Sequence, residues 1–513
     1  MAQLVRLKRT VYLLHRWMGV GGCVLMLLWL ISGVVMLFVG YPKLLPQERL
    51  VALPTLDAAA CCLPPERALV HSAAPEAVRQ IQLTSVAGRP RYMLREGDGR
   101  LVAVDALSGQ RIGRIDASQA LASAQAFKPG TIPAAIDSLL DEDRWTHSGA
   151  LDAHRPLYRV QMGDAESTVL YVSSATGQVV MDAPLAQRAW NAIGAWLHWL
   201  YMFREGSRDP VWSWTVIVLS ALGTVLALTG LLAGLWRWRF SGRYKSGART
   251  PYRGLGLRWH HTLGMLFGVM LLGWIFSGLM SMNPLGIFDP AGPRPDQAAY
   301  RQGQPGELRL AGSPAQVLAS LQAQGFEARE LEWRVLNGQP FVLARNGTGT
   351  TRVVMADTTH GDDRLVVLDQ WPQATLREAA SRLLPAGIVS AELLPSHDAF
   401  YYQRGTSSMY AADARRLPAL RLQFDDPGRT RVYLDVYTGD VALSVDRSQR
   451  LGRWLFNLLH SWDLPLFLKA PIAREAILTL LSLGASLIAI TGCVIGCQRL
   501  RAHLRGRRHL SSS

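Results

Sequence analysis

The sequence predicts a membrane protein whose main part is a bundle of four transmembrane helices in two internal repeats, with two α+β domains outside the membrane. Four stretches are apolar for long enough to cross a bilayer as a helix, which takes about 20 residues. The second half of the chain also repeats a residue pattern of the first half. Of the 513 residues, 49% are hydrophobic and 18% are charged, a balance that favours a membrane protein with soluble parts.

The apolar stretches run over residues 13–39, 211–236, 262–282 and 472–497. Basic residues precede the first stretch, as in a signal peptide, but its length and its repetition at the third stretch favour a retained helix. The middle of each stretch contains no Asp, Glu or Lys. A transporter, which internal repeats would also suggest, is therefore the weaker interpretation.

The net charge of +15 is concentrated beside the apolar stretches. Arginines and lysines, without any acidic residue, occupy 1–16 before the first stretch, 237–258 between the second and third, and 499–508 after the fourth. Such an excess marks the cytoplasmic side of a membrane protein. We therefore expect cytoplasmic termini, a cytoplasmic central loop and two long segments on the opposite side, and no nucleic-acid binding.

The predicted order of domains follows from these boundaries. It is a first transmembrane helix (1–40), an outer domain (41–186), an interfacial helix with the second transmembrane helix (187–240), a basic cytoplasmic loop (241–258), the third transmembrane helix (259–282), a second outer domain (283–448), an interfacial helix with the fourth transmembrane helix (449–498), and a basic cytoplasmic tail (499–513).

Each outer domain alternates helical patterns with β-branched strands that end in a glycine turn, as at 171–177 and 433–439. Two small α+β units are expected in each domain, four in all. The stretches at 187–203 and 449–468 are amphipathic, rich in aromatic residues, and predicted as helices at the outer membrane interface. Five cysteines give too little framework to predict a structural disulfide.

Histidines recur at equal positions of the repeats. When the sequence is aligned with itself so that His15 matches His260, Gly19, Trp29, Ser32 and Gly33 also match Gly264, Trp274, Ser277 and Gly278. In a second alignment, in which His198 matches His460, Gln187, Arg188 and Leu197 match Gln449, Arg450 and Leu459. The same alignment matches Arg237 with Arg499. By topology, His15 and His260 share the cytoplasmic level and His198 and His460 the outer level.

Two pairs of histidines in membrane segments indicate haem. Ionisable residues there are costly and usually functional, and two neutral imidazoles fill both axial positions of a haem iron, which favours electron transfer. Zinc is the weaker alternative, because it takes closely clustered ligands. His261 lies next to His260, so only the repeat selects His260 as the ligand.

Glycines at helical spacing from His15 and His260, namely Gly19, Gly22, Gly264 and Gly268, leave room for a flat ring; close helix packing explains them as well. Arginines near the histidines are candidates for haem propionates, or equally for lipid headgroups. They are Arg16 and Arg258 inside, and Arg188, Arg204, Arg450 and Arg453 outside. No dinucleotide fingerprint or phosphate loop appears, so quinol or a separate reductase is expected to supply electrons.

The residues that carry a resemblance are the run from His15 to Gly19 that opens a span, the Leu-His pairs ending in His198 and His460, and the strand turns ending in Gly177 and Gly439. Over nearly the whole chain the sequence resembles the PepSY-associated transmembrane family. The resemblance implies two periplasmic PepSY-like domains and a bacterial inner-membrane location. It also implies b-type haem and a role as a ferric-siderophore reductase.

The combined interpretation is an inner-membrane di-haem b electron-transfer protein that reduces ferric siderophore iron, or another ferric chelate, to Fe(II) on the periplasmic side. His15 and His260 would bind one haem iron and His198 and His460 the other; the choice between one and two haems stays open. Tyr401, Tyr402, Arg404 and Trp371 are candidates to line the chelate site. The alternative is a haem-free, membrane-anchored PepSY binding or regulatory protein that acts on secreted proteases or other periplasmic partners.

Overall fold

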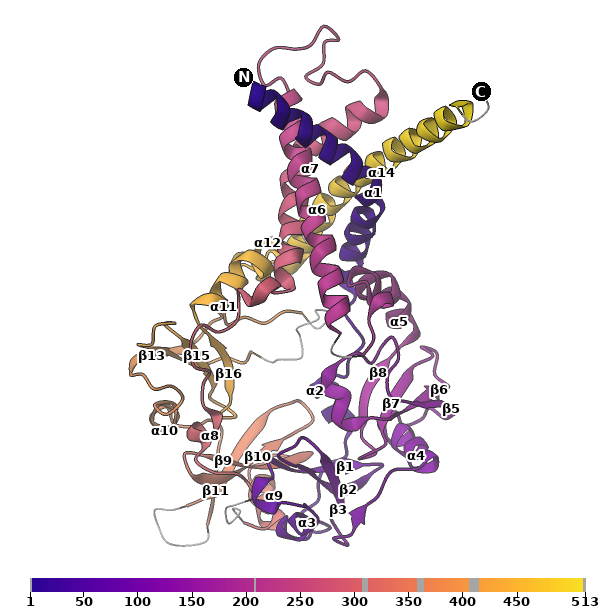
Figure 1. The fold of residues 1–513 in the computed structure, drawn as a ribbon. Helices are drawn as coiled ribbons and strands as arrows, with labels where there is room; N and C mark the ends of the chain where they lie inside the picture. Colours follow the sequence, from indigo (N-terminus) through magenta and orange to yellow (C-terminus); the bar gives the residue numbers. More distant parts are fainter. Residues whose placement is uncertain (1, 207–208, 307–311, 358–363, 406–414, 511–513) are drawn as a thin grey trace.

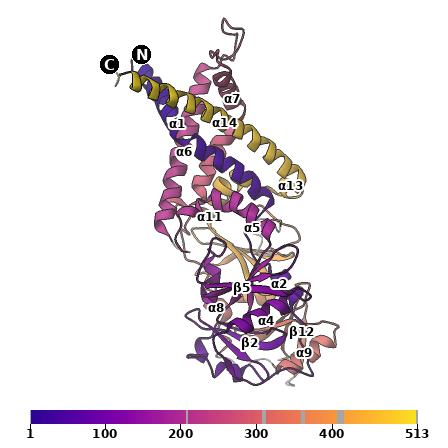
Figure 2. The ribbon, with the colours of Figure 1, turned by 90° about the vertical axis from the view of Figure 1, so that its right-hand side faces the viewer.

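The computed structural model describes residues 2–206, 209–306, 312–357, 364–405 and 415–510. A bundle of long helices stands on a group of β-sheets, and both ends of the chain lie at the far end of the bundle (Figure 1). Figure 2 shows the same two layers from a second direction. The two ends of the bundle are called the terminal side, where the chain begins and ends, and the sheet side.

Within the described residues, four helices are long and apolar enough to cross a membrane. They are α1 (Ala2–Phe38), α6 (Pro210–Arg237), α7 (Leu255–Ser281) and α14 (Pro471–Leu510). Asp209 caps α6 by accepting a hydrogen bond from the Trp212 backbone N–H, and Pro210 follows as the first helical residue. On the terminal side α1 and α14 extend beyond the predicted apolar stretches, because Arg, Lys, Leu and Ala all favour helix there.

The four helices form a ring in which α1 packs on α6 and α14, and α7 packs on the same two helices. Met26, Trp29, Trp274 and Ile275 are buried between them. Gly223 allows close packing, because an added Cβ would lie 2.7 Å from Met26 Cε. The outward faces carry exposed leucine and valine side chains, for which a lipid environment is favourable.

In the residues that the structure describes, the sheet layer consists of three antiparallel sheets. The largest has the order β12-β11-β10-β9-β1-β2-β3-β4. Its strands are β1 (Gln80–Val86), β2 (Arg89–Arg95), β3 (Leu101–Asp105), β4 (Arg111–Ile112), β9 (Glu330–Leu336), β10 (Gln339–Arg345), β11 (Thr351–Ala356) and β12 (Leu365–Leu368). Short helices flank this sheet: α2 (Pro46–Ala52), α3 (Glu66–Leu69), η1 (Pro75–Ala77), α8 (Gln297–Arg301) and α9 (Pro314–Gln322).

The other two sheets have four strands each, in sequence order. One contains β5 (Pro133–Leu140), β6 (Leu157–Met162), β7 (Val169–Ser173) and β8 (Val179–Ala183), with α4 (Ala117–Phe127) and η2 (Gly149–His154). The other contains β13 (Ile388–Leu394), β14 (Ala419–Phe424), β15 (Arg431–Asp435) and β16 (Val441–Val445), with α10 (Gln373–Ala380).

The sequence predicts four separate α+β units, but the described residues form three sheets. The first unit of the first outer segment and the first unit of the second outer segment share one sheet, in which β1 pairs with β9. In this pairing Gln82 lies opposite Glu332. Glu330 is fully buried at the joint, where it accepts hydrogen bonds from Arg49 and from Thr84. The joint connects residues far apart in the chain, so no local pattern predicts it.

Two irregular segments connect the four-stranded sheets to the bundle, where the sequence predicts interfacial helices. The first contains α5 (Leu185–Asn191), the π-helical η3 (Ala192–Trp196) and η4 (Tyr201–Phe203). The second contains α11 (Arg447–Gly452), the π-helical η6 (Arg453–Leu458), α12 (Leu459–Ser461) and α13 (Pro465–Leu468). Left-handed residues, Leu200 with φ 55° and Trp462 with φ 53°, interrupt both segments at equal positions.

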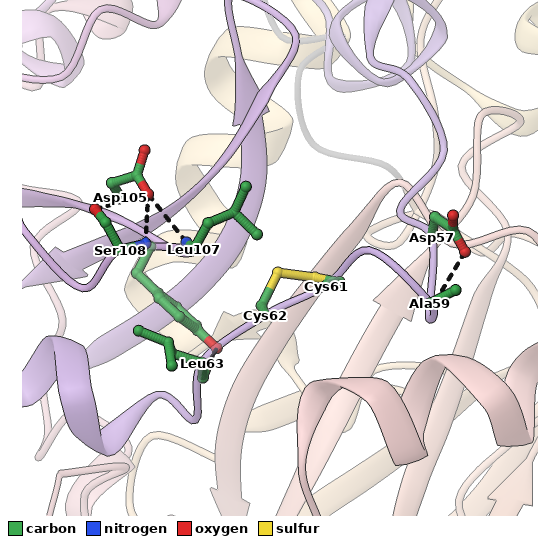
Figure 3. The surroundings of a disulfide bond; sticks show 9 residues. Asp57, Ala59, Cys61, Cys62, Leu63, Asp105, Leu107 and Ser108 are labelled. Atoms are coloured by element: carbon green, nitrogen blue, oxygen red, sulfur yellow. Dashed lines mark hydrogen bonds between the residues drawn. A yellow bond between two sulfur atoms is a disulfide. The ribbon is translucent and has the colours of Figure 1, made fainter.

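One disulfide joins the adjacent residues Cys61 and Cys62 on the loop between α2 and α3 (Figure 3). The sequence did not predict it. The loop is held in place by its neighbours, because Tyr92 donates a hydrogen bond of 2.6 Å to the Leu63 carbonyl. Both cysteines pack against the hydrophobic core of the eight-stranded sheet.

A short helix, η5 (Pro284–Gly286), begins the second outer segment.

Candidate functional site

The four histidines singled out by the repeats lie in two pairs, one with tilted rings and one with rings edge to face. His15 of α1 and His260 of α7 have ring centres 6.1 Å apart, and His198 after η3 and His460 of α12 have ring centres 6.2 Å apart. The first pair lies within the bundle and the second where the connecting segments meet its sheet side. The structure thus brings together the two pairs that the repeat register predicts.

In the first pair, the hydrogen bonds assign the tautomer of both rings. His15 Nδ1 lies 3.2 Å from the Leu226 carbonyl oxygen, and His260 Nδ1 lies 3.1 Å from the Ile488 carbonyl oxygen. A carbonyl oxygen can only accept, so each Nδ1 carries the proton in the hydrogen-bonded form. Each Nε2 then keeps a free lone pair.

Serines play the same part in the second pair. Ser32 Oγ lies 3.0 Å from His198 Nδ1, and Ser277 Oγ lies 3.0 Å from His460 Nδ1. Each hydroxyl donates its own hydrogen to a carbonyl of the preceding helical turn: Ser32 to Leu28 at 2.7 Å, and Ser277 to Trp274 at 3.0 Å. The oxygen therefore accepts from Nδ1–H, and Nε2 again keeps its lone pair.

The spacing of the rings suits a single ion between them. A metal–imidazole bond is about 2 Å long and the bonded nitrogen lies about 1 Å from its ring centre, so two imidazoles on opposite sides of one ion have centres about 6 Å apart. Both pairs have this spacing. Within the described part of the chain, no group of three or more His, Cys, Asp or Glu side chains could hold a metal. Each pair thus has the ring spacing of two imidazoles that share one ion.

His261, the alternative to His260, uses both ring nitrogens within the protein. Nε2 lies 2.9 Å from the Gly234 carbonyl oxygen and so carries the proton, and Nδ1 lies 2.7 Å from Thr250 Oγ1 and accepts from it. No lone pair of His261 is left for a metal in this arrangement. Its role is to hold residues 250–252 against the bundle, with the Tyr252 ring 5.4 Å from its own.

A cavity of about 290 Å³ adjoins the His15–His260 pair. Its glycines are Gly19, Gly230, Gly234, Gly264, Gly268, Gly492 and Gly496. Gly230 is a tight position, because an added Cβ would lie 2.6 Å from His15 Cε1. At its counterpart Gly492 an added Cβ would lie 3.5 Å from His260 Cε1, an ordinary contact. Small residues thus bring the helix backbones next to both imidazoles and line the cavity beside them.

The arginines of this cavity differ in part from those expected. Arg16 lines it, together with Arg237 and Arg499, whereas Arg258 is exposed elsewhere on α7. The Arg237 guanidinium stacks over the Tyr12 ring at 4.5 Å. The repeat register contains Arg237 and Arg499, and this was the signal in the sequence that pointed to them. The cavity therefore combines two imidazoles with positive charge.

The outer arginines that the sequence proposed for propionates mainly bind backbone carbonyls. Arg188 donates to Ser167 O at 2.7 Å and Arg450 to Arg429 O at 2.7 Å. The Arg204 guanidinium lies over Tyr201 and Trp212, at 4.8 and 4.9 Å from the ring centres. Arg453 is buried and donates to Ala399 O at 2.9 Å. The contacts of Arg188, Arg450 and Arg453 fasten the sheets to the connecting segments, and that of Arg204 fastens a connecting segment to α6.

Two of the candidate chelate residues are core residues. Trp371 is buried in the core between β10, β14 and β15, and Tyr401 is buried against Tyr433 with its ring stacked at 5.2 Å. Burial raises the pKa of Tyr401 to about 12, so its hydroxyl stays neutral. Tyr402 and Arg404 contact Asp463 at the sheet side of the bundle. Trp371 and Tyr401 are therefore wrong as lining residues, because aromatic side chains in a loop sequence do not reveal their burial.

Comparison with known proteins gives one finding about the family. The sequence matches, over residues 12–371, the family described as PepSY-associated TM region. The matched range includes α1 from residue 12 onward, all of α6 and α7, and the histidines at 15, 198 and 260. No curated protein matches the sequence.

Proposed function

This chain belongs to the family of the PepSY-associated TM region, and on that premise we propose that it is a di-haem b electron-transfer protein of the bacterial inner membrane. In this proposal it reduces the iron of a ferric siderophore, or of another ferric chelate, to Fe(II) on the periplasmic side. Electrons come from the cytoplasmic side or from quinol. The membrane location itself rests on the four apolar helices and on the family.

The observation that carries the proposal is the equal construction of the two histidine pairs. Each pair has the ring spacing of two axial ligands, and each of the four Nδ1 atoms has an acceptor that leaves Nε2 free. The glycine-lined cavity supports the first site, because a flat macrocycle needs backbone surfaces beside the iron ligands. Arg237 and Arg499 are suited to bind its propionates.

When bound, a haem held by both imidazoles of a pair would supply one-electron transfer and would leave no open position for oxygen. The protein's own residues would hold the two sites. His15 and His260 hold one site inside the bundle, and His198 and His460 hold the other at the sheet side. The apolar helices keep water away from the space between them. The sheets, fastened to the second pair, hold the ferric chelate near it.

The first test is the absorption spectrum of the purified protein. We expect a Soret band, a b-type α band on reduction, and two haems per chain in a pyridine haemochromogen assay. His15→Ala and His198→Ala should each remove about one haem and leave the other. His261→Gln is the matched control, since it alters a neighbouring histidine of α7 and should retain both haems.

Other outcomes would decide against parts of the proposal. A colourless protein would exclude the redox function and favour the haem-free PepSY binding or regulatory protein. If each single histidine variant lost both haems equally, the assignment of ligands to pairs would be wrong. Loss of haem in His261→Gln but not in His260→Ala would show that His261, and not His260, is the ligand.

The second test concerns the substrate. The protein is reduced anaerobically and mixed in a stopped-flow instrument with ferric siderophores of different chelating groups, and a ferrous-iron indicator reports the product. We expect haem oxidation and Fe(II) formation in a ratio of one to one. His198→Ala should abolish this reaction, whereas an unreacted haem with every ferric chelate would contradict the assigned substrate class.

A further inference from the structure

Several residues from separate elements near His460 bind Asp463. Its carboxylate has no solvent exposure, although it lies in an irregular segment between α12 and α13. Arg474 at the start of α14 donates to Oδ1 at 3.2 Å, and Arg404 and Tyr402 from the segment between β13 and β14 bind Oδ2. A buried carboxylate with several charge-assisted hydrogen bonds is held firmly in place.

The same group also fixes the turn that follows His460. The Arg474 Nε atom donates to the Ser461 carbonyl at 2.8 Å, and Arg453 at the start of η6 donates to the Asp463 carbonyl. Trp462, between them, has the left-handed backbone conformation. Asp463 thus ties a sheet segment, a π-helical segment and a transmembrane helix to the residues next to His460.

The repeat provides an internal comparison. At the position of Asp463 the first half has Tyr201, and at the position of Arg474 it has Trp212. Trp212 Nε1 donates to the Trp199 carbonyl at 2.7 Å, as Arg474 does to Ser461. The turn after His198 is therefore held in the same way by aromatic residues, with Arg204 over the rings of Tyr201 and Trp212, and tyrosine stands where the second half has the carboxylate of Asp463.

These charges do not cancel. The carboxylate of Asp463 binds the guanidinium groups of Arg404 and Arg474, and the guanidinium of Arg453 binds the backbone carbonyl of the same residue, so positive charge is in excess. Reduction of a haem iron removes one positive charge from the site. An excess of positive charge next to a ligand therefore stabilises the ferrous form and raises the reduction potential.

We propose that Asp463 and its arginines are positioning residues that set the reduction potential of the His198–His460 site through His460, which rests on the proposed haem function. The cluster holds the imidazole by the turn that follows it. Its net positive charge stabilises the reduced form of the site that His460 helps to build.

The test is a charge cycle measured by spectroelectrochemical titration of the full-length, haem-loaded protein. Asp463→Asn should raise the potential of the sheet-side haem, and Arg474→Gln should lower it. The double variant should return it toward that of the unaltered protein. The wave that disappears in His198→Ala identifies the sheet-side haem, and the other wave serves as an internal reference that should not move.

Two variants provide matched controls. Lys469→Gln removes a charge from the same segment, but from an exposed side chain, and should shift the potential far less than Arg474→Gln. Tyr201→Phe alters the position equivalent to Asp463 without a change of charge and should leave both potentials unchanged.

The outcomes separate this inference from the proposed function. Two haem waves that do not move, or that move in the same direction in Asp463→Asn and Arg474→Gln, would overturn the inference and leave the haem function standing. Shifts that add instead of cancelling in the double variant would also overturn it, since they indicate general damage to the fold. A protein without haem would overturn both.

Discussion

Gly230 faces the imidazole of His15 so closely that a Cβ atom added to the glycine would lie 2.6 Å from His15 Cε1. The glycine lies on α6 and the histidine on α1, so their contact is a property of the bundle. In the second half, the equivalent pair is Gly492 and His260. A Cβ added to Gly492 would lie 3.5 Å from His260 Cε1, which is 0.9 Å farther than in the first half. The two glycines therefore make different predictions.

Gly230→Ala is expected to displace His15 and to remove about one haem per chain, whereas Gly492→Ala should retain both. Alanine is a better helix former than glycine by about 1 kcal/mol, so neither change weakens the helix itself. Haem content and the absorption spectrum measure the effect. Equal haem content in the two variants would show that His15 is not held at the distance described.

Ser32→Ala and Ser277→Ala are expected to weaken haem binding at the sheet-side pair. Each change removes the acceptor of a histidine Nδ1–H, and loss of such an outer contact typically costs about 10–100-fold in metal affinity. Haem retention during titration with a haem-binding competitor measures the change. Thr224→Ala is the control, because Thr224 Oγ1 donates only to the Ser220 carbonyl of its own helix, at 2.8 Å.

Glu330→Ala is expected to destabilise the eight-stranded sheet by about 3–5 kcal/mol, since it leaves the Arg49 charge without its partner at the joint of β1 and β9. Urea unfolding followed by tryptophan fluorescence measures the change, because Trp333 of β9 is fully buried. The double variant Arg49→Met with Glu330→Leu should recover most of the loss. A double variant as unstable as Glu330→Ala would refute the ion-pair explanation.

Asp182→Asn is expected to stabilise the sheet β5–β8 at pH 7.5 by about 1–2 kcal/mol. Burial, and then the charge of Glu48, raise the pKa of Asp182 to about 6. The folded chain thus binds this proton more tightly than the unfolded chain, and the stability it contributes is present below pH 4 and lost as the pH rises through 6. An asparagine at position 182 does not titrate, so the variant does not lose stability in this way as the pH rises.

Thermal unfolding at several pH values tests this prediction. The gain in melting temperature of Asp182→Asn should be largest at pH 7.5 and should shrink as the pH falls from 6 toward 4. Glu327→Gln, at an exposed position before β9, is the control and should show no such trend. A gain that is independent of pH would contradict the raised pKa.

The sequence alone was sufficient for the features that depend on local pattern. Four apolar stretches predicted the four membrane helices, because the length of a helix that crosses a bilayer is set by the bilayer itself. The motif around His15 and the strand turns predicted the family, which the match over residues 12–371 confirms. The register of the repeats selected the four histidines. Their role as haem ligands stays a prediction.

Only the tertiary structure decided what depends on contacts between distant residues. It shows that His261 binds Thr250 and Gly234 while His260 faces His15, although the two histidines are adjacent in the chain. It places Trp371 and Tyr401 in cores and joins β1 to β9. Hydrogen-bond partners and burial arise from the packing of separate elements, and a sequence pattern reports only the element to which a residue belongs.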